Sequence, residues 1–162
     1  MRNRLTLIRG VLVMGGMLLI VMGCVTGAGC VPRTTRTPLR DALVEEIRRF
    51  KETPYLYGGS TPKGTDCSGF TMTVFKRFGV KLSHSASKQF KMGRPVSRRN
   101  LKMGDLVFFR RGRHGSINHV GIYLWDGKMV HASSSRGVIV VRWEGNIYYE
   151  HRYAGARRII DF

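Results

Sequence analysis

One cysteine and two histidines of this 162-residue chain stand where the catalytic groups of a thiol hydrolase would be expected. Cys67 follows Asp66 at the expected start of a helix, and His119 and His131 lie on apolar segments downstream. A cysteine supplies a nucleophile, a histidine removes its proton, and a second polar group holds that histidine in the reactive tautomer. We therefore predict Cys67 as the nucleophile, His119 as the base and His131 as the orienting residue.

Each of these residue types also has a common structural role. A lone buried cysteine is usually unreactive, and a lone histidine on a strand is more often a surface or satisfied core residue. Zinc binding is the other joint use of cysteine and histidine, but the chain lacks CxxC and HExxH spacing. We expect no metal and no organic cofactor. Three further histidines in polar or loop surroundings are expected to be incidental, namely His84, His114 and His151.

The helix that begins near Cys67 is expected to lower the pKa of its thiol. The apolar residues of one helix face recur at helical spacing, namely Phe70, Val74, Phe75 and Phe78. Thr65 or Asp66 is the expected N-cap, and Gly79 ends the helix. Because the first turn has unpaired N–H groups and the positive end of the helix dipole, it favours a thiolate.

The two histidines share one face of a sheet only if the loop between their strands has an odd number of residues. A two-residue loop places them on opposite faces, because side chains alternate along a strand. A three-residue loop over residues 125–127, with Gly127 left-handed in a G1 bulge, changes the register. His131 then lies opposite Gly121 and diagonal to His119. We predict this odd loop.

The remaining pattern predicts an α+β fold, with helices first and an antiparallel sheet afterwards. An amphipathic helix is expected over residues 38–51, and a glycine-rich loop over residues 55–65. A short helix is expected around residues 85–90. Short apolar or alternating runs predict strands at residues 105–109, 120–124, 128–132, 137–141 and 152–160.

The first 23 residues have the features of an export signal. Three arginines without an acid precede an apolar stretch, residues 11–22, that is too short for a membrane span of about 20 residues. Residues 21–24, Val-Met-Gly-Cys, resemble a bacterial lipobox, which implies that Cys24 is diacylated after the leader is cut. We predict a signal peptide with a lipobox (1–23), a lipidated tether (24–38) and a catalytic domain (39–162). An uncleaved helix over residues 5–23 is the alternative, and Cys30 is a weaker lipidation candidate.

The chain is strongly basic, with 28 lysines and arginines against 10 acids and a net charge of +18. Loss of residues 1–23 lowers this charge only to +15. Such a charge predicts a polyanionic partner. The export signal argues against nucleic acid and favours peptidoglycan carboxylates or lipid headgroups. We expect a cell-envelope protein anchored by lipid, on the outer membrane facing the periplasm, with an envelope adaptor protein as a further candidate partner. Candidates to attract stem carboxylates are Arg110, Arg111 and Arg113, for which a solvated face is the alternative.

Five segments, in order, resemble the NlpC-type cell-wall peptidases, a papain-like group of bacterial cysteine hydrolases. They are residues 55–59 (YLYGG), 65–70 (TDCSGF), 101–109 (LKMGDLVFF), 119–123 (HVGIY) and 130–133 (VHAS). The resemblance extends from about residue 54 to residue 158. It implies a papain-like fold with the nucleophile at a helix start. It also implies a Cys-His-His triad at Cys67, His119 and His131.

The resemblance further implies oxyanion or substrate contacts at Tyr55, Asp66 and Ser68. Residues 83–85 are Ser-His-Ser where many relatives have Pro-Arg-Ser, a departure that affects the substrate contacts implied there and not the chemistry. Lipoprotein members of the family cleave peptide bonds in peptidoglycan stems, through a thioester acyl-enzyme. A non-catalytic murein-binding lipoprotein, or an acyltransferase or amidase with the same triad, is the alternative.

Overall fold

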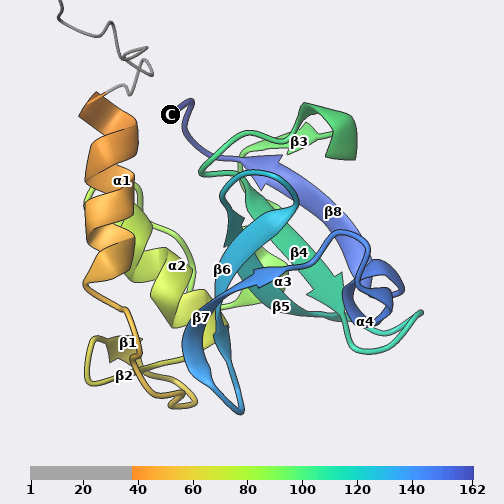
Figure 1. The fold of residues 1–162 in the computed structure, drawn as a ribbon, viewed down its shortest axis with the longest axis horizontal. Helices are drawn as coiled ribbons and strands as arrows, with labels where there is room; N and C mark the ends of the chain where they lie inside the picture. The colour runs from red at the N-terminus through yellow and green to blue at the C-terminus, as the bar shows by residue number, and fades with distance from the viewer. Residues whose placement is uncertain (1–37) are drawn as a thin grey trace, which may run out of the picture. The chain divides into compact units, whose positions relative to one another are not determined.

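The structure, a computed structural model, describes residues 38–162 (Figure 1). The predicted signal peptide, the lipobox with Cys24, and Cys30 all lie outside the described residues. So does the predicted tether, apart from residue 38. Within residues 38–162, the helices are too short or too polar to cross a membrane.

Three helices form the N-terminal half of the domain: α1 (Pro38–Arg48), α2 (Cys67–Lys76) and α3 (Ala86–Gln89). The first ends at Arg48 instead of at residue 51. Phe50, in the turn that follows, is still buried and packs edge-on against Phe70, with 5.3 Å between the ring centroids. The glycine-rich loop between α1 and α2 contains a small antiparallel pair that was not predicted, β1 (Ser60–Thr61) and β2 (Gly64–Thr65).

The C-terminal half is a six-stranded antiparallel sheet with the order β3-β8-β4-β5-β6-β7. The strands are β3 (Arg94–Val96), β4 (Leu106–Arg110), β5 (Ile117–Tyr123), β6 (Lys128–Ser133), β7 (Gly137–Arg142) and β8 (Tyr153–Arg158). All five predicted strands are present, and the α+β class is confirmed. Three short elements were not predicted: β3, the 3₁₀ turn η1 (Arg98–Asn100) and α4 (Ile147–Glu150).

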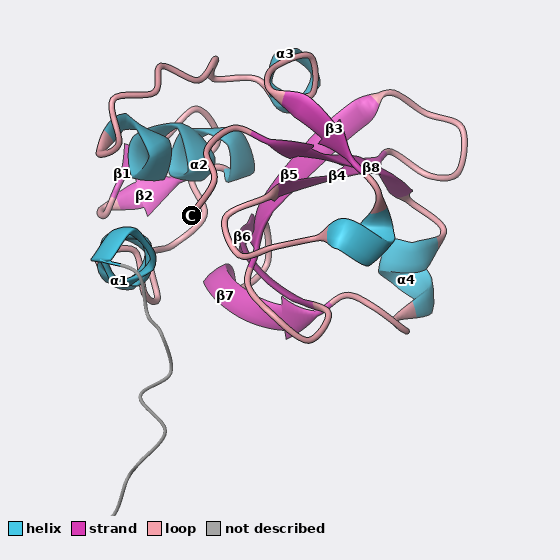
Figure 2. Cartoon of the chain, turned by 90° about the horizontal axis from the view of Figure 1, so that it is seen from above, coloured by secondary structure: helices cyan, strands magenta, loops and turns pink. Residues whose placement is uncertain are grey.

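The sheet buries side chains on both faces, because strand residues alternate between two separate cores. One core contains Phe70 and Val74 of α2 together with Val120 and Ile122 of β5. The other core, on the opposite face, is built from Val107, Phe109, Met129, Trp143 and Ala156. Helices α1 and α2 lie on one side of the domain and α4 on the other (Figures 1 and 2). Helix α2 packs against the inner strands β5 and β6 of the sheet.

A buried ion pair joins the residue before β4 to the last residue of β8. The Asp105 carboxylate is fully buried and accepts hydrogen bonds from Nε and Nη2 of Arg158, at 2.6 and 2.7 Å. It also accepts from the backbone N–H of Lys102 at 2.8 Å. Buried charges are stable only when paired and hydrogen-bonded. The 101–109 segment therefore has a structural role here, since its acid anchors the sheet.

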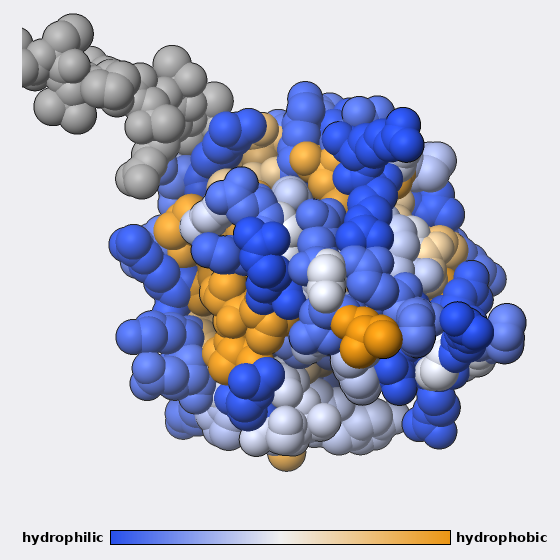
Figure 3. All heavy atoms as spheres, turned by 45° about the vertical axis from the view of Figure 1, so that its right-hand side comes forward, coloured by the Kyte–Doolittle hydropathy of each residue, from blue (hydrophilic) through white to orange (hydrophobic). Residues whose placement is uncertain are grey.

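The surface is mainly polar. The face drawn in Figure 3 is mostly hydrophilic, with separate apolar patches. The most exposed large hydrophobic residues are Tyr57, Ile147, Leu56 and Tyr148, which lie in the loop before α2 and in α4. This distribution agrees with the high charge of the sequence.

Candidate active site

Cys67 is the first residue of α2, as predicted, and Asp66 is the N-cap. The Asp66 carboxylate accepts the backbone N–H of Gly69 at 2.7 Å, which satisfies one of the free donors of the first helical turn. The Cys67 side chain is buried, and its sulfur lies 3.8 Å from the carbonyl oxygen of Asn118. Helix α2 is thereby in contact with the residue that precedes His119 on β5.

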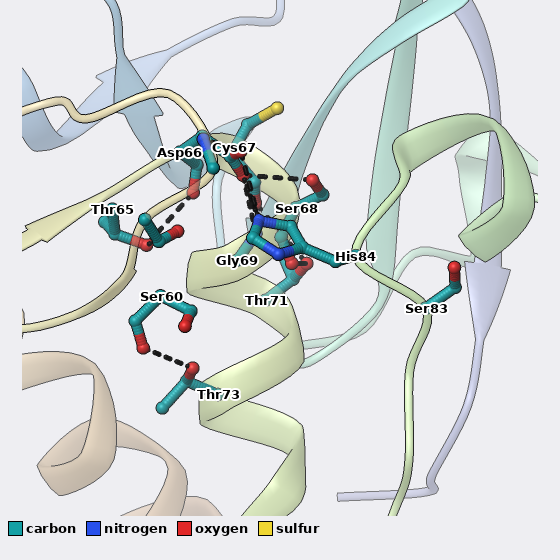
Figure 4. A network of polar contacts seen from close by, with 12 residues as sticks. Ser60, Thr65, Asp66, Cys67, Ser68, Gly69, Thr71, Thr73, Ser83 and His84 are labelled. Carbon is teal, nitrogen blue, oxygen red and sulfur yellow. Dashed lines mark hydrogen bonds and ion pairs between the residues drawn. The ribbon is translucent and has the colours of Figure 1, made fainter.

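Asp66 is also the centre of a wider polar network (Figure 4). Besides Gly69, its carboxylate accepts from the backbone N–H of Gly58 at 2.9 Å and from the Ser68 hydroxyl at 3.0 Å. His84 Nε2 lies 3.1 Å from both carboxylate oxygens. Burial alone would raise the pKa of Asp66, but these hydrogen bonds together lower it. The carboxylate is therefore an ionised anchor between the 58–59 loop and α2.

The expectation that His84 is incidental was wrong, because its ring contacts Asp66, the N-cap of α2. In Figure 4 the Cys67 sulfur points away from the His84 ring. The observed contacts of Asp66 and Ser68 are those of a helix cap, and neither residue lines the cavity described below. Their role toward substrate stays a prediction.

The β5–β6 hairpin has the predicted odd register. Ile122 pairs with Val130 and Tyr123 with Met129, so position 121 lies opposite position 131. The turn conformation differs from the prediction in one respect. Asp126 as well as Gly127 has a positive φ (48° and 67°), as in a type I′ turn.

The turn itself has two residues, and a β-bulge beside it adds the extra residue that gives the hairpin its odd register. Lys128 N donates to Trp125 O at 2.9 Å, and Leu124 N donates to Lys128 O at 2.9 Å. Two residues, 124 and 125, thus oppose Lys128. The register prediction is confirmed, whereas the predicted G1 geometry was wrong.

The register brings the two histidine rings together. His119 Nε2 lies 2.7 Å from His131 Nδ1, with the rings nearly perpendicular at 89°. Gly121 leaves space for this pair, since a Cβ there would lie 3.2 Å from the Cβ of His131 and 2.9 Å from the Met129 sulfur. The geometry is that of a histidine held by a second histidine.

Tyr149 extends the pair, and sequence reasoning missed it. Its hydroxyl lies 3.3 Å from His131 Nε2, on the side of the ring away from His119. Tyr149 belongs to α4, a four-residue helix whose Asn146 N-cap accepts from Tyr148 N at 3.0 Å. The Asn146 capping residue was the only sequence signal, and it is too weak to place a tyrosine against a strand 18 residues away.

These groups line one cavity of about 700 Å³. Tyr55, Cys67, His119 and His131 all contribute to its wall, together with Tyr149. Tyr55 pairs with Thr65 in an isolated bridge, which places the backbone of Tyr55 beside the segment that leads into α2. Burial, and then the charges of Cys67 and Asp66, raise the pKa of Tyr55, so its hydroxyl stays a hydrogen-bond donor.

The resting cavity favours neutral groups. Burial raises the pKa of the Cys67 thiol to about 11, although the backbone N–H of Val120 acts in the opposite direction. Burial lowers the pKa of His119 to about 4 and that of His131 to about 3. The prediction that the helix start lowers the thiol pKa was wrong for this state, because desolvation outweighs the helix terminus.

Residues 38–162 contain no cluster of three or more histidine, cysteine or acidic side chains arranged to hold a metal ion. Cys67, His119 and His131 line one cavity, and the contact between the two imidazoles has the geometry of a histidine and its orienting group.

The sequence model of the NlpC/P60 family matches residues 52–158, which include every residue of this cavity. The chain belongs to the NlpC/P60 family. It is 43% identical over 124 residues to an Escherichia coli K12 protein named murein DD-endopeptidase MepS/murein LD-carboxypeptidase, covering 76% of this chain and 64% of the relative. It is 36% identical over 126 residues to a Bacillus cereus protein named gamma-D-glutamyl-L-lysine dipeptidyl-peptidase, covering 76% of this chain and 38% of that protein.

Solved structures of the NlpC/P60 family share the fold. A family member from Bacillus cereus superposes with a TM-score of 0.71 at 35% identity, covering 78% of this chain and 42% of that one. The NlpC/P60 domain of the peptidoglycan hydrolase SagA superposes with a TM-score of 0.63 at 32% identity, covering 73% of this chain and 97% of that domain. The expected papain-like α+β fold of the NlpC/P60 family is thereby confirmed.

Gly121→Ala is expected to disturb the histidine pair without removing either ring. The added methyl group would press on His131 and Met129, and overpacking of this kind costs about 1–3 kcal/mol. Urea unfolding would measure the loss, and imidazole nitrogen chemical shifts would report the change at His119. Gly145→Ala is the control, because its Cβ meets nothing within 4 Å while its φ of 77° still costs stability. Unchanged imidazole shifts in Gly121→Ala would contradict the packing argument.

Alkylation of Cys67 by iodoacetamide is expected to accelerate with pH through and beyond pH 9. Only the thiolate reacts, and a pKa of about 11 keeps the thiol protonated at neutral pH. Peptide-resolved mass spectrometry after timed alkylation would give the rate, with the Cys30 peptide as an internal reference. A rate that levels off below pH 7 would instead indicate a preformed thiolate–imidazolium pair.

Proposed function

We propose that this chain is a lipid-anchored cysteine peptidase that hydrolyses peptide bonds in peptidoglycan stem peptides or cross-links. The observation that carries the proposal is the 2.7 Å contact between His119 and His131 in the cavity that also holds the Cys67 thiol. The names of the relatives, a murein endopeptidase and a peptidoglycan hydrolase among them, support the same substrate class. Because the chain spans 64% of the length of the Escherichia coli relative, that activity is carried over as a proposal.

The hydrogen-bond chain from Tyr149 to His119 can run in two directions, and only one leaves a base in the cavity. A neutral imidazole has one donor and one acceptor nitrogen. If His131 donates from Nε2 to the Tyr149 oxygen, its Nδ1 accepts from His119 Nε2, and His119 Nδ1 is left unprotonated. In the reverse direction His119 Nδ1 carries the proton and is no base. We assign the first direction to the reactive state.

The reaction then follows as an acyl transfer. As the Cys67 sulfur attacks the stem-peptide carbonyl, its proton passes to His119 Nδ1, so charge develops only when substrate is in place. The backbone N–H of Cys67 and the Tyr55 hydroxyl are the donors for the oxyanion. His119 returns the proton to the leaving amine, and a thioester remains on Cys67. Water, activated by the same imidazole, hydrolyses the thioester.

A module that only holds murein is the competing function. Such a module would use the basic surface and would gain nothing from a histidine held by a second histidine and a tyrosine. A buried neutral thiol beside a neutral imidazole costs desolvation and adds no affinity for an anion. This arrangement therefore favours hydrolysis over binding alone.

The proposed location is the bacterial cell envelope. Cys24 would carry the lipid after removal of residues 1–23, and residues 24–38 would link it to the catalytic domain, at the outer membrane facing the periplasm. The support is the sequence of residues 1–24, with its basic start, apolar stretch and lipobox-like end. A tether of this kind would hold the cavity close to murein.

Removal of the nucleophile should abolish hydrolysis with the fold intact. Cys67→Ala is expected to lower muropeptide release from purified sacculi at least about 1000-fold. His119→Ala should lower it at least about 100-fold, and His131→Ala by less, since the base remains. Mass spectrometry of the released muropeptides would measure the rates and identify the bond cut. His114→Ala, an exposed histidine outside the cavity, is the matched control. Turnover by Cys67→Ala within tenfold of the wild type would contradict the proposal.

Cys24→Ala is expected to prevent acylation and to leave the hydrolytic rate of the protein in solution unchanged. Incorporation of a palmitate analogue in cells would be the measurement, with Cys30→Ala as the control that keeps the label. A Cys24→Ala protein that still carries label would move the anchor elsewhere or remove the lipoprotein proposal.

A further inference from the structure

Four arginines line the same cavity as the candidate catalytic groups. They form what we call the arginine rim: Arg110, Arg111, Arg136 and Arg152. They come from the end of β4 and the turn after it, from the β6–β7 turn, and from the residue pair that follows α4. The described lining of the cavity contains no aspartate or glutamate. Three separate segments therefore direct positive charge toward one space.

The arginine rim differs from the other arginines of the domain in having no acidic partner. Arg158 pairs with Asp105, and Arg98 pairs with Glu150 and Glu144. Within residues 38–162, in contrast, none of the four rim arginines has a carboxylate oxygen within 4 Å. Their charges are left for a ligand to neutralise.

Two of the four are already held in place by other contacts. Arg152 donates to the Tyr148 carbonyl at 2.8 Å and stacks 3.9 Å over the Tyr148 ring. Arg110 donates to the Gly115 carbonyl at 3.4 Å. Each retains further N–H donors, because a guanidinium has five. A preorganised guanidinium loses less entropy when it binds a carboxylate.

Arg136 is the rim arginine in the turn that directly follows the strand of His131. It lies in the tight turn between β6 and β7, where its backbone N–H donates to the Ser133 carbonyl at 3.3 Å. Burial is the largest cause of the lowered pKa of His131, followed by the charge of His119 and then that of Arg136. The charge of Arg136 also acts to lower the pKa of Tyr149, which burial raises. Its side chain is exposed and has no hydrogen-bonded partner in the described part of the chain. Arg136 is thus close to the site and free to bind an anion.

The transfer of a proton from His119 to the leaving group indicates which part of the substrate would contact the arginine rim. His119 must give its proton to the leaving nitrogen, so the leaving group lies on the imidazole side of the cavity. The Cys67 N–H and Tyr55, which would hold the oxyanion, come from the helical half of the chain. Arg136 follows the same strand as His131 by a few residues. Arg136 and His131 therefore belong to one strand and its turn, which associates the arginine rim with the leaving-group side of the cavity.

We propose that the arginine rim, with Arg136 in the turn that follows the strand of His131, is a subsite for a free carboxylate on the leaving residue of the substrate. The preferred carboxylate is the one on the carbon that bears the released nitrogen, since it is the closest to the scissile bond. Stem peptides in which this carboxylate is amidated would be poor substrates. The inference rests on the proposed hydrolysis and specifies the substrate class of the same cavity.

The test uses two stem peptides that differ only in this carboxylate, free in one and amidated in the other. The full-length wild type is expected to show a kcat/KM at least about tenfold higher for the free acid. Arg136→Gln should lose most of that preference by lowering the rate on the free acid alone, and Arg136→Lys should keep part of it. Arg142→Gln, at the far end of β7 and outside the cavity, is the control of equal charge change.

Each outcome decides one of the two proposals. Equal wild-type rates on both peptides would overturn the carboxylate subsite and leave the hydrolase proposal standing. An equal loss in Arg142→Gln would overturn the local subsite in favour of a general field. If the wild type cleaves neither peptide, the hydrolase proposal fails, and binding to Cys67→Ala decides the subsite. A tighter Kd for the free acid that Arg136→Gln abolishes would support it, and equal Kd values would overturn it.

Discussion

The hydrogen bond between His119 and His131 depends on the register of a single hairpin. Side chains alternate along strands, so a shift by one residue would turn His131 away from His119 and into the core against α2. The register is held outside the hairpin as well, because the Gly127 carbonyl accepts from the backbone N–H groups of Trp143 and Glu144, at 2.9 and 3.2 Å. The segment that leads to α4, and so to Tyr149, is therefore attached to the turn that sets the histidine pair.

The position of the nucleophile depends in a similar way on one carboxylate. Asp66 accepts from Gly58 of the loop, from Gly69 of α2 and from the Ser68 hydroxyl, while His84 approaches from the segment before α3. These donors belong to separate stretches of chain, and each loses its partner if the carboxylate is lost. An unsatisfied buried donor costs about 1–3 kcal/mol. The family motif around Cys67 thus contains several residues that hold the cysteine in place.

The parts of this site that follow a local rule could be predicted from the sequence. Asp66 as N-cap, Cys67 at the first helical position and the odd register at Gly127 each follow from a few neighbouring residues. The parts that depend on non-local packing were missed. They include Tyr149 against His131, His84 against Asp66, and the Asp105–Arg158 pair across 53 residues. The thiol pKa was wrong for the same reason, since a helix terminus is visible in sequence but the desolvation of Cys67 is a property of the whole fold.

Strand β5 connects the two halves of the site. Its Asn118 carbonyl lies 3.8 Å from the Cys67 sulfur, and the next residue is His119. The pairing of Phe109 with His119 and of Phe108 with Val120 fixes the strand against β4, which Asp105 and Arg158 secure to β8. The distance between the thiol and the imidazole is therefore set by packing of α2 on a sheet in which a buried ion pair joins the start of β4 to the end of β8. A neutral thiol and a neutral imidazole can be kept in one cavity in this way because rigid elements, and not their mutual charge, hold them in place.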